Sequence, residues 1–296
     1  MSPSATAVRF SPETLTVLNL SLAFLMFAVS LFVEGHDFRV LRERPRGLLA
    51  GLTMQWLGLP LLSVALIALI RPEPGLALGM LLVAACPGGT VSNFLNLVAR
   101  ANVALSIGLT TISTVAAAVT TPLLFFAGAH LAAGSIAIPA LQVDLADMLG
   151  LVLLIVAAPL AAGQLLRHYA PRFADGIRGT ARRAAGAVLV LFIVAACVNN
   201  ARAFLEALPH VGWIVVLQNT LALAGGYGVA TAYRLPGADR RAITLESGIH
   251  NSGLGLVLIF NFFGGSTPMA LVAAGWGVWH LVSGGALALW WSRRPV

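Results

Sequence analysis

Nine apolar stretches, each long enough to cross a lipid bilayer as a helix, occupy most of this chain of 296 residues. A membrane-spanning helix needs about 20 predominantly apolar residues. The nine predicted spans cover residues 15–33, 48–70, 75–101, 103–133, 145–166, 184–204, 211–233, 241–263 and 269–291. We therefore expect an all-α polytopic membrane protein with nine transmembrane helices.

The composition of the chain agrees with lipid as its main solvent. Hydrophobic residues make up 58% of the sequence and charged residues only 10%. A soluble domain of this size cannot bury so much apolar surface in one core. The net charge of +7 rests on arginines alone, and these lie in short connections between apolar runs. This pattern indicates orientation in a membrane, and we expect no nucleic-acid partner. The two cysteines fit no metal or redox spacing, so we expect no bound cofactor.

The placement of the arginines predicts how the chain crosses the membrane. With the N-terminus outside, fifteen of the eighteen arginines fall in the inside connections, and only Arg9, Arg71 and Arg202 fall outside. This asymmetry supports nine spans with a cytoplasmic C-terminus. The longest polar connection, about 167–183, is expected to be a loop, and residues 1–296 form a single membrane domain. The arginine- and alanine-rich composition favours a bacterial inner membrane.

Two of the predicted spans are interrupted by residues that break helices. The third carries Pro87, Gly88 and Gly89 in its middle, and proline removes a backbone donor while glycine weakens a helix. In the eighth, Gly248 and Gly253 flank a polar group, which consists of Glu246, Ser247, His250, Asn251 and Ser252. Unwound backbone at membrane depth is tolerated only in protein or beside a wet cavity. Two such interruptions in matching places are typical of a transporter binding site.

The spacing of the interruptions predicts an internal repeat. Gly88 and Gly248 lie 160 positions apart, which corresponds to about five spans. Because five is odd, the two copies would insert in opposite senses and form an inverted repeat. Nine spans are one short of two five-span copies. We therefore expect the first copy to lack its leading helix.

Glu246 is the only acidic residue that lies well inside a predicted span, roughly 7–8 Å beyond Arg241 at 1.5 Å per residue. A carboxylate at that depth is costly unless it is paired, protonated or bound to a cation. It could cap nearby backbone amides, but a cation ligand is the stronger interpretation. Hard cations such as sodium prefer oxygen ligands. The oxygen-bearing residues available near the interruptions are Ser92, Asn93, Ser106, Thr110 and Glu246. Serine and threonine hydroxyls also bond to their own helix, which is the alternative role for each of them.

Two further polar residues lie within spans. Gln55 is a neutral amide in the second span, where it serves either as a sodium ligand or as a hydrogen-bonding link between helices. His280 lies midway along the ninth span. A lone histidine there is usually a packing residue, and the alternative is that it faces a central cavity.

The strings CPGGTVSNFLNLVARANVALSIGLTT and ESGIHNSGLGL, with WHLVSG in the last span, resemble the bile acid:sodium symporter family over nearly the whole chain. The resemblance implies two crossing broken helices in a core domain with a panel domain beside it. The panel would consist of the first span, which lies within about 15–70, and of the helices in about 145–204. The core would consist of the helices in about 48–133 and 211–291. It also implies the arrangement of nine-helix members, which lack the leading helix of ten-helix ones.

The resemblance also assigns roles to individual residues. It places a first sodium site at Ser92, Asn93, Ser106, Thr110 and Glu246. A second sodium site would use Gln55, Glu246, the backbone carbonyls of Ser247 and Ile249, and the side chain of His250, where the family carries glutamine. The substrate cavity would be lined by Thr90, Asn251 and His280.

The expected function is therefore sodium-coupled uptake of an organic anion, either bile-acid-like or a small carboxylate, by alternating access and without enzyme activity. Sodium ions, the anion and the lipid bilayer are the expected partners. One alternative is proton coupling on the same fold, with a proton shared by Glu246 and His250. A second is an intramembrane hydrolase using Ser92 or Ser252 with His250 or His280, for which no motif fixes a nucleophile and base. A channel is not supported, because the sequence has no filter motif.

Overall fold

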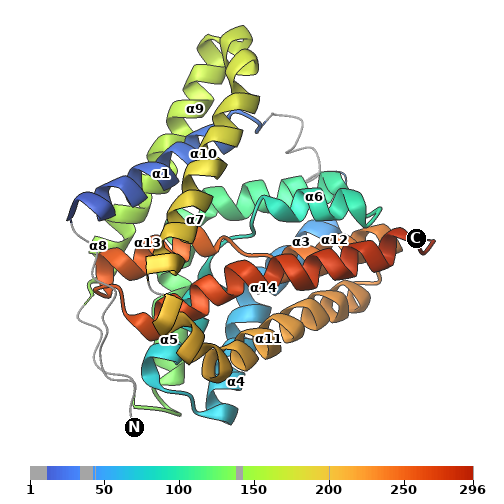
Figure 1. The fold of residues 1–296 in the computed structure, drawn as a ribbon. Coiled ribbons are helices and arrows are strands. Elements are labelled where there is room, and N and C mark those ends of the chain that lie inside the picture. The colour runs from blue at the N-terminus through green and yellow to red at the C-terminus, as the bar shows by residue number, and fades with distance from the viewer. Residues whose placement is uncertain (1–11, 34–42, 44, 138–142, 200, 296) are drawn as a thin grey trace.

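A computed structural model describes residues 12–33, 43, 45–137, 143–199 and 201–295, and all named elements in these ranges are helices (Figure 1). The uninterrupted helices are α1 (Pro12–Ser30), α7 (Val103–Ala132), α10 (Pro171–Asn199), α11 (Ala201–Ala232) and α14 (Thr267–Ser292). Each of the nine predicted spans falls on one or more helices. The expectation of an all-α protein is therefore confirmed for the described residues.

Two helical segments change pitch near a proline. The second span consists of α3 (Pro45–Thr53), the π-helical turn η2 (Met54–Gly58) and α4 (Leu59–Ile70), in which Pro60 occupies the first turn. The fifth has the same pattern, with α8 (Leu145–Val152), η3 (Leu153–Ala157) and α9 (Ala158–Tyr169). Proline has no amide hydrogen to donate to the preceding turn, and a widened turn accommodates that loss. Gln55 lies within η2, so the widened turn presents a polar side chain inside the protein.

The expected loop at 167–183 is wrong. The chain there is helical except at Ala170, because α9 continues to Tyr169 and α10 already begins at Pro171. Proline is favoured at the first position of a helix, where its missing donor is not needed. Ala174, Ala181 and Ala185 are buried on one face of α10, while Asp175 and Arg183 are exposed. The stretch is an amphipathic helical extension whose polarity made it look like a loop.

Five of the described helices are long and apolar enough to cross a membrane. They cover Pro45–Ile70, Val103–Ala132, Leu145–Tyr169, Val211–Ala232 and Thr267–Ser292. Shorter apolar helices cover Leu15–Ser30, Pro74–Ala85 and Ser252–Phe262. The last two are halves of the interrupted spans, which explains their length. The chain is thus a polytopic membrane protein, and the count of nine spans stays a prediction. Arg39, Arg42 and Arg44 of the first inside connection lie outside the described residues.

The helices pack as two neighbouring groups (Figure 1). In one, α14 packs against α5, α11 and α13, while α12 packs against α6, α7 and α11. In the other, α1 packs against α9 and α10. A pair of reciprocal side-chain hydrogen bonds joins α1 to α13, from Asn19 to Asn261 at 3.1 Å and from Asn261 to Asn19 at 2.8 Å.

The two interrupted spans cross at their interruptions. One consists of α5 (Pro74–Ala85) and α6 (Val91–Val98), and the other of α12 (Gly237–Gly248) and α13 (Ser252–Phe262). The backbone amide of Gly89 donates to the carbonyl of Ile249, and that of Asn251 donates to the carbonyl of Pro87, both at 2.8 Å. The exposed backbone groups of each interruption therefore pair with the other. Both predicted breaks are confirmed, although Gly253 lies in the first turn of α13 rather than in the break.

Candidate functional site

The carboxylate of Glu246 lies at the centre of a buried oxygen cluster. The hydroxyl of Ser92 donates to its Oε2 at 2.6 Å, that of Ser106 to the same oxygen at 2.9 Å, and that of Thr110 to Oε1 at 2.6 Å. Glu246 is 1% exposed. Among the described residues no arginine forms an ion pair with it. The carboxylate is therefore held by hydroxyl groups alone.

Asn93 completes the set predicted from the sequence. Its Oδ1 lies 2.7 Å from the hydroxyl of Ser106 and 3.3 Å from that of Thr110. Three helices thus supply the cluster: α6 carries Ser92 and Asn93, α7 carries Ser106 and Thr110, and α12 carries Glu246. All five residues predicted from the sequence are brought together.

A tight connection between α6 and α7 places these side chains. Arg100 adopts a left-handed conformation with φ 53°, which reverses the chain after α6. Asn102 then caps α7 by accepting from the amide of Leu105 at 3.1 Å, and its side chain donates to Asp239 of α12 at 2.8 Å. Because Ser106 and Thr110 are four residues apart, both face α12 and α6. The cap and the link to Asp239 fix α7 against α12.

The arrangement has the chemistry of a site for a hard monovalent cation. It offers carboxylate, amide and hydroxyl oxygens, and no sulfur or imidazole nitrogen is part of the cluster. A buried carboxylate without a cationic partner is costly at membrane depth, and a bound cation would remove that cost. The described residues hold no group of three or more histidine, cysteine or acidic side chains that could bind a transition metal.

Gly88 and Gln55 lie beside the carboxylate at the crossing. A Cβ atom at Gly88 would overlap with Oε1 of Glu246 and would lie 3.1 Å from Nε2 of Gln55. Gln55 is 3% exposed, and neither its amide nitrogen nor its amide oxygen has a hydrogen-bond partner among the residues that the structure describes. A buried amide without partners is rare in proteins. Gln55 is therefore a free polar group next to Glu246, as a ligand position would require.

The other residues predicted for a second sodium site are engaged with protein groups. The ring of His250 lies between two carbonyls, with Nδ1 2.7 Å from Cys86 and Nε2 3.1 Å from Ser247. The carbonyl of Ile249 accepts from Gly89. Both predicted carbonyl ligands thus already have one partner each, and the structure does not gather this set as it gathers the first.

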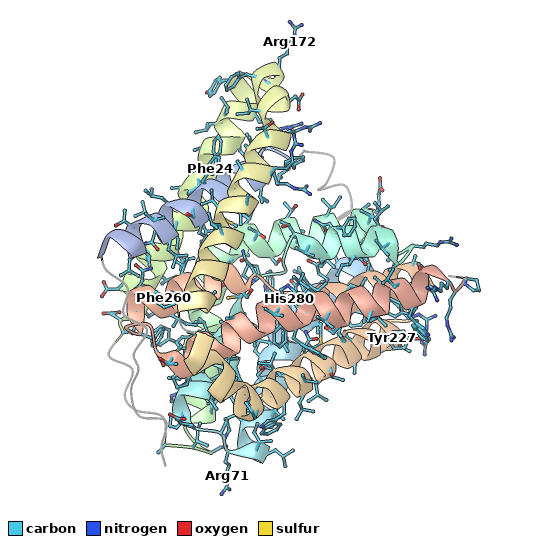
Figure 2. All side chains as sticks on the ribbon, in the orientation of Figure 1. Phe24, Arg71, Arg172, Tyr227, Phe260 and His280 are labelled. Carbon is cyan, nitrogen blue, oxygen red and sulfur yellow. The ribbon has the colours of Figure 1, made fainter. Side chains whose placement is uncertain are left out.

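The three predicted substrate residues belong to three different helices. Thr90 is the exposed N-cap of α6 and lines a cavity together with Asn93 and Thr110. Asn251 caps α13 by accepting from the amide of Leu254 at 3.1 Å. His280 lies near the middle of α14 (Figure 2), is 6% exposed, and has no partner at Nδ1. Only Thr90 lies on the cavity wall.

Two sets of residues at this site escaped the sequence analysis. Asn96 is fully buried and donates to the hydroxyl of Ser106 at 2.8 Å. Its position one turn after Ser92 and Asn93, on the same helical face, could have indicated it. Arg178 and Arg182 line the cavity, but they were placed in the expected loop. Recognising the helical spacing of the alanines in α10 would have placed both on one face.

Comparison with known proteins identifies the family of this chain. A sequence model of the sodium bile acid symporter family matches residues 19–207. The chain belongs to that family. It is 30% identical to the uncharacterized sodium-dependent transporter YocS of Bacillus subtilis over 283 residues, which cover 94% of this chain and 83% of that protein. The probable sodium/metabolite cotransporter BASS2 of rice is 30% identical over 94% of this chain and 64% of its own length. The probable sodium/metabolite cotransporter BASS1 of Arabidopsis thaliana is 31% identical over 94% of this chain and 67% of its own length.

The family resemblance seen in the two interrupted spans is thereby confirmed. The chain is a sodium-coupled transporter of the membrane and not an enzyme. The names of these relatives give sodium as the ion on which their transport depends.

Proposed function

We propose that the chain is a symporter that uses a sodium gradient to take up a small organic anion by alternating access. The observation that carries the proposal is the cluster around Glu246, in which a buried carboxylate and four neutral oxygen-bearing side chains converge with no cationic partner in the described part of the chain. The sodium site consists of Ser92, Asn93, Ser106, Thr110 and Glu246. The free amide of Gln55 adds a ligand at the crossing.

Sodium binding would order the crossing for the anion. A cation among these oxygens offsets the repulsion between the carboxylate and the neighbouring oxygens, and it offsets the free-energy cost of burying the carboxylate charge. It also links α6, α7 and α12. The start of α6, at Thr90 on the cavity wall, then presents a positive helix end to an anion. If the ion raises the affinity for the anion, the anion must raise the affinity for the ion by the same factor.

Alternating access needs two bodies that move against each other. We assign α1, α8, η3, α9 and α10 to a panel, and the remaining helices to a core that carries both crossing helices. The antiparallel pairing of the two interruptions supports an inverted repeat of nine spans, in which the first copy lacks its leading helix. The N-terminus would lie outside, and the arginine-rich C-terminus would lie in the cytoplasm of a bacterium.

The test is uptake by the full-length protein in proteoliposomes, driven by a sodium gradient and, separately, by a proton gradient in sodium-free buffer. We expect uptake only with sodium. Glu246→Gln should abolish it, because an amide keeps the shape but loses the charge. The matched control is Glu73→Gln, since Glu73 is exposed in the connection before α5. Equal uptake with a proton gradient alone would show that transport is coupled to protons and not to sodium. Normal sodium-driven uptake by Glu246→Gln would refute the ion site.

A further inference from the structure

A cavity of about 330 Å³ adjoins the Glu246 cluster. Its volume is at the lower end of the range of about 300–1,000 Å³ that is typical of small-molecule pockets. Asn93 and Thr110 belong both to the cluster and to the cavity wall, and Thr90, Thr111 and Thr114 add hydroxyls to that wall. A molecule in the cavity would therefore be next to the ion site without occupying it.

The apolar part of the cavity is formed by branched and aromatic side chains from both groups of helices. Val29 lies in the last turn of α1, and Phe32 and Val33 lie just after its end, while Ile107 comes from α7 and Leu160 from α9. The cavity thus lies between side chains of α7, α1 and α9, and Figure 1 shows α1 and α9 beside α10. Its walls suit a ligand with a compact hydrocarbon body.

Two guanidinium groups complete the lining. Arg178 and Arg182 are four residues apart on α10, so they share one helical face. Their Cζ atoms lie 5.5 Å and 5.1 Å from the centre of the Phe32 ring. Phe32 therefore holds both cations in a defined place by cation–π attraction. Arg178 also contacts Asp175 at 3.3 Å, so Arg182 carries the charge that is not matched by that carboxylate.

Orientation of the chain in the membrane does not explain why these arginines line a cavity. Arg172 and Arg183 lie on the same helix, in the same predicted inside connection, and neither lines the cavity. Any arginine in this stretch would serve the orientation equally well. Guanidinium groups fixed beside an apolar pocket are instead suited to bind a carboxylate, because their planar fork matches its two oxygens.

We propose that Arg182, supported by Arg178 and Phe32, binds the carboxylate of the transported anion, and that the substrate is a compact monocarboxylate with a branched or aromatic body. This inference rests on the proposed function and specifies its substrate class. The hydroxyls of Thr90 and Thr111 lie in the same cavity and would accept or donate hydrogen bonds to a hydroxyl group on the substrate. The wall shared with the ion site gives the route by which sodium and substrate affect each other's affinity.

The experiment measures the thermal stability of the purified full-length protein with three acids: isovalerate, leucate and phenylacetate. Each acid is compared with its uncharged primary amide, and each measurement is made in sodium chloride and in choline chloride. A ligand that prefers the folded state raises its apparent stability. In the wild type, we expect at least one acid to stabilise the protein in sodium, with an affinity about tenfold or more above that of its amide. Arg182→Gln should lose this preference, while Arg182→Lys should keep part of it. Arg183→Gln is the matched control, because it removes the same charge from the adjacent position, and it should behave as the wild type.

A second measurement does not depend on the stability of the variant. Phenylglyoxal modifies exposed arginines, and site-resolved mass spectrometry of the wild type reports each one separately. The effective acid should slow modification at Arg182 and leave Arg183 unchanged.

The outcomes separate this inference from the proposed function. If no acid stabilises the wild type, or if Arg182→Gln keeps the preference for acid over amide, the arginine site is refuted. Unchanged modification of Arg182 in the presence of a stabilising acid also refutes it. If stabilisation requires Arg182 but is equal in choline and in sodium, the anion site stands and sodium coupling fails.

Discussion

Gly88 and His250 face each other across the crossing of the two interrupted helices, as an isolated antiparallel pair in an otherwise helical described chain. The pairing brings the backbone of α5–α6 so close to α12 that the carboxylate of Glu246 occupies the space where a side chain at Gly88 would lie. The ion site and the helix crossing are therefore a single packed unit. A change at the crossing should alter sodium binding even where no ligand atom is removed.

Gly88→Ala tests this coupling directly. The added methyl group would overlap with Oε1 of Glu246, so either the carboxylate or the crossing has to move. We expect a loss of about 1–3 kcal/mol in the free energy of unfolding and a clear rise in the sodium concentration needed for half-maximal stabilisation. Sodium titrations of thermal stability measure both. Gly285→Ala on α14 is the control, because a Cβ there meets no atom within 4 Å. An unchanged sodium midpoint in Gly88→Ala would show that the crossing and the ion site are independent.

His250→Gln should change the number of sodium ions that bind. In the native chain both ring nitrogens of His250 face carbonyl oxygens, and one of these carbonyls, that of Ser247, is a predicted ligand of the second sodium site. A glutamine amide can donate to the carbonyl of Cys86 and still offer its own oxygen to a cation. We expect a Hill coefficient for sodium near one in the native protein and clearly above one in the variant, measured from sodium titrations of uptake.

The control for that substitution is His130→Gln, which changes an exposed histidine in the last turn of α7. It should leave the Hill coefficient as in the native protein. A native coefficient already well above one, or an unchanged value in His250→Gln, would count against a second site blocked by histidine.

The sequence predicts the parts of this site that depend on local chemistry. Pro87 and Gly88 cannot sustain a helix, and Glu246 is too costly in lipid to lack a partner, so the residues alone indicate both the break and the ion ligand. Ser106 and Thr110 were indicated as oxygen-bearing residues near an interruption, and their spacing of four places both on one helical face. The partners of His250 could not be predicted, because they depend on how the two breaks pair across 160 residues. The position of Arg182 on a helix could not be predicted for another reason, because hydropathy alone does not distinguish the polar, amphipathic start of a helix from a loop.

Arg241 joins three segments at the end of the protein that we place in the cytoplasm. Its guanidinium group donates to the carbonyls of Ala99 at 2.9 Å, Trp291 at 3.2 Å and Pro295 at 2.6 Å. It thereby satisfies the ends of α6 and α14 from its position on α12, and its charge is favourable at both helix C-termini. Arg241→Met should cost about 3 kcal/mol or more of folding stability, because several buried carbonyls lose a charged donor.

Thermal unfolding of the purified protein measures that cost. Arg293→Met removes the same charge from the same end of the chain, at an exposed position, and should have little effect on the melting temperature. Equal melting temperatures for the two variants would mean that the contacts of Arg241 contribute nothing.

Asn219 stabilises the second break from the side of α11. Its amide donates to the carbonyl of Gly248 at 2.7 Å, at the end of α12, and its oxygen accepts from Ser283 of α14 at 2.6 Å. Asn219 is fully buried, so Asn219→Leu would leave the carbonyl of Gly248 without its donor inside the protein. We expect a loss of about 1–3 kcal/mol in stability, together with weaker sodium binding, because Gly248 is only two residues from Glu246.

Ser283→Ala should cost less, since it leaves the bond to Gly248 in place. Thr220→Val is the neighbouring control, because that exposed hydroxyl bonds only to its own helix at Val216. If Asn219→Leu lowers stability but leaves the sodium midpoint unchanged, Asn219 supports the fold alone and does not hold the break in its ion-binding form.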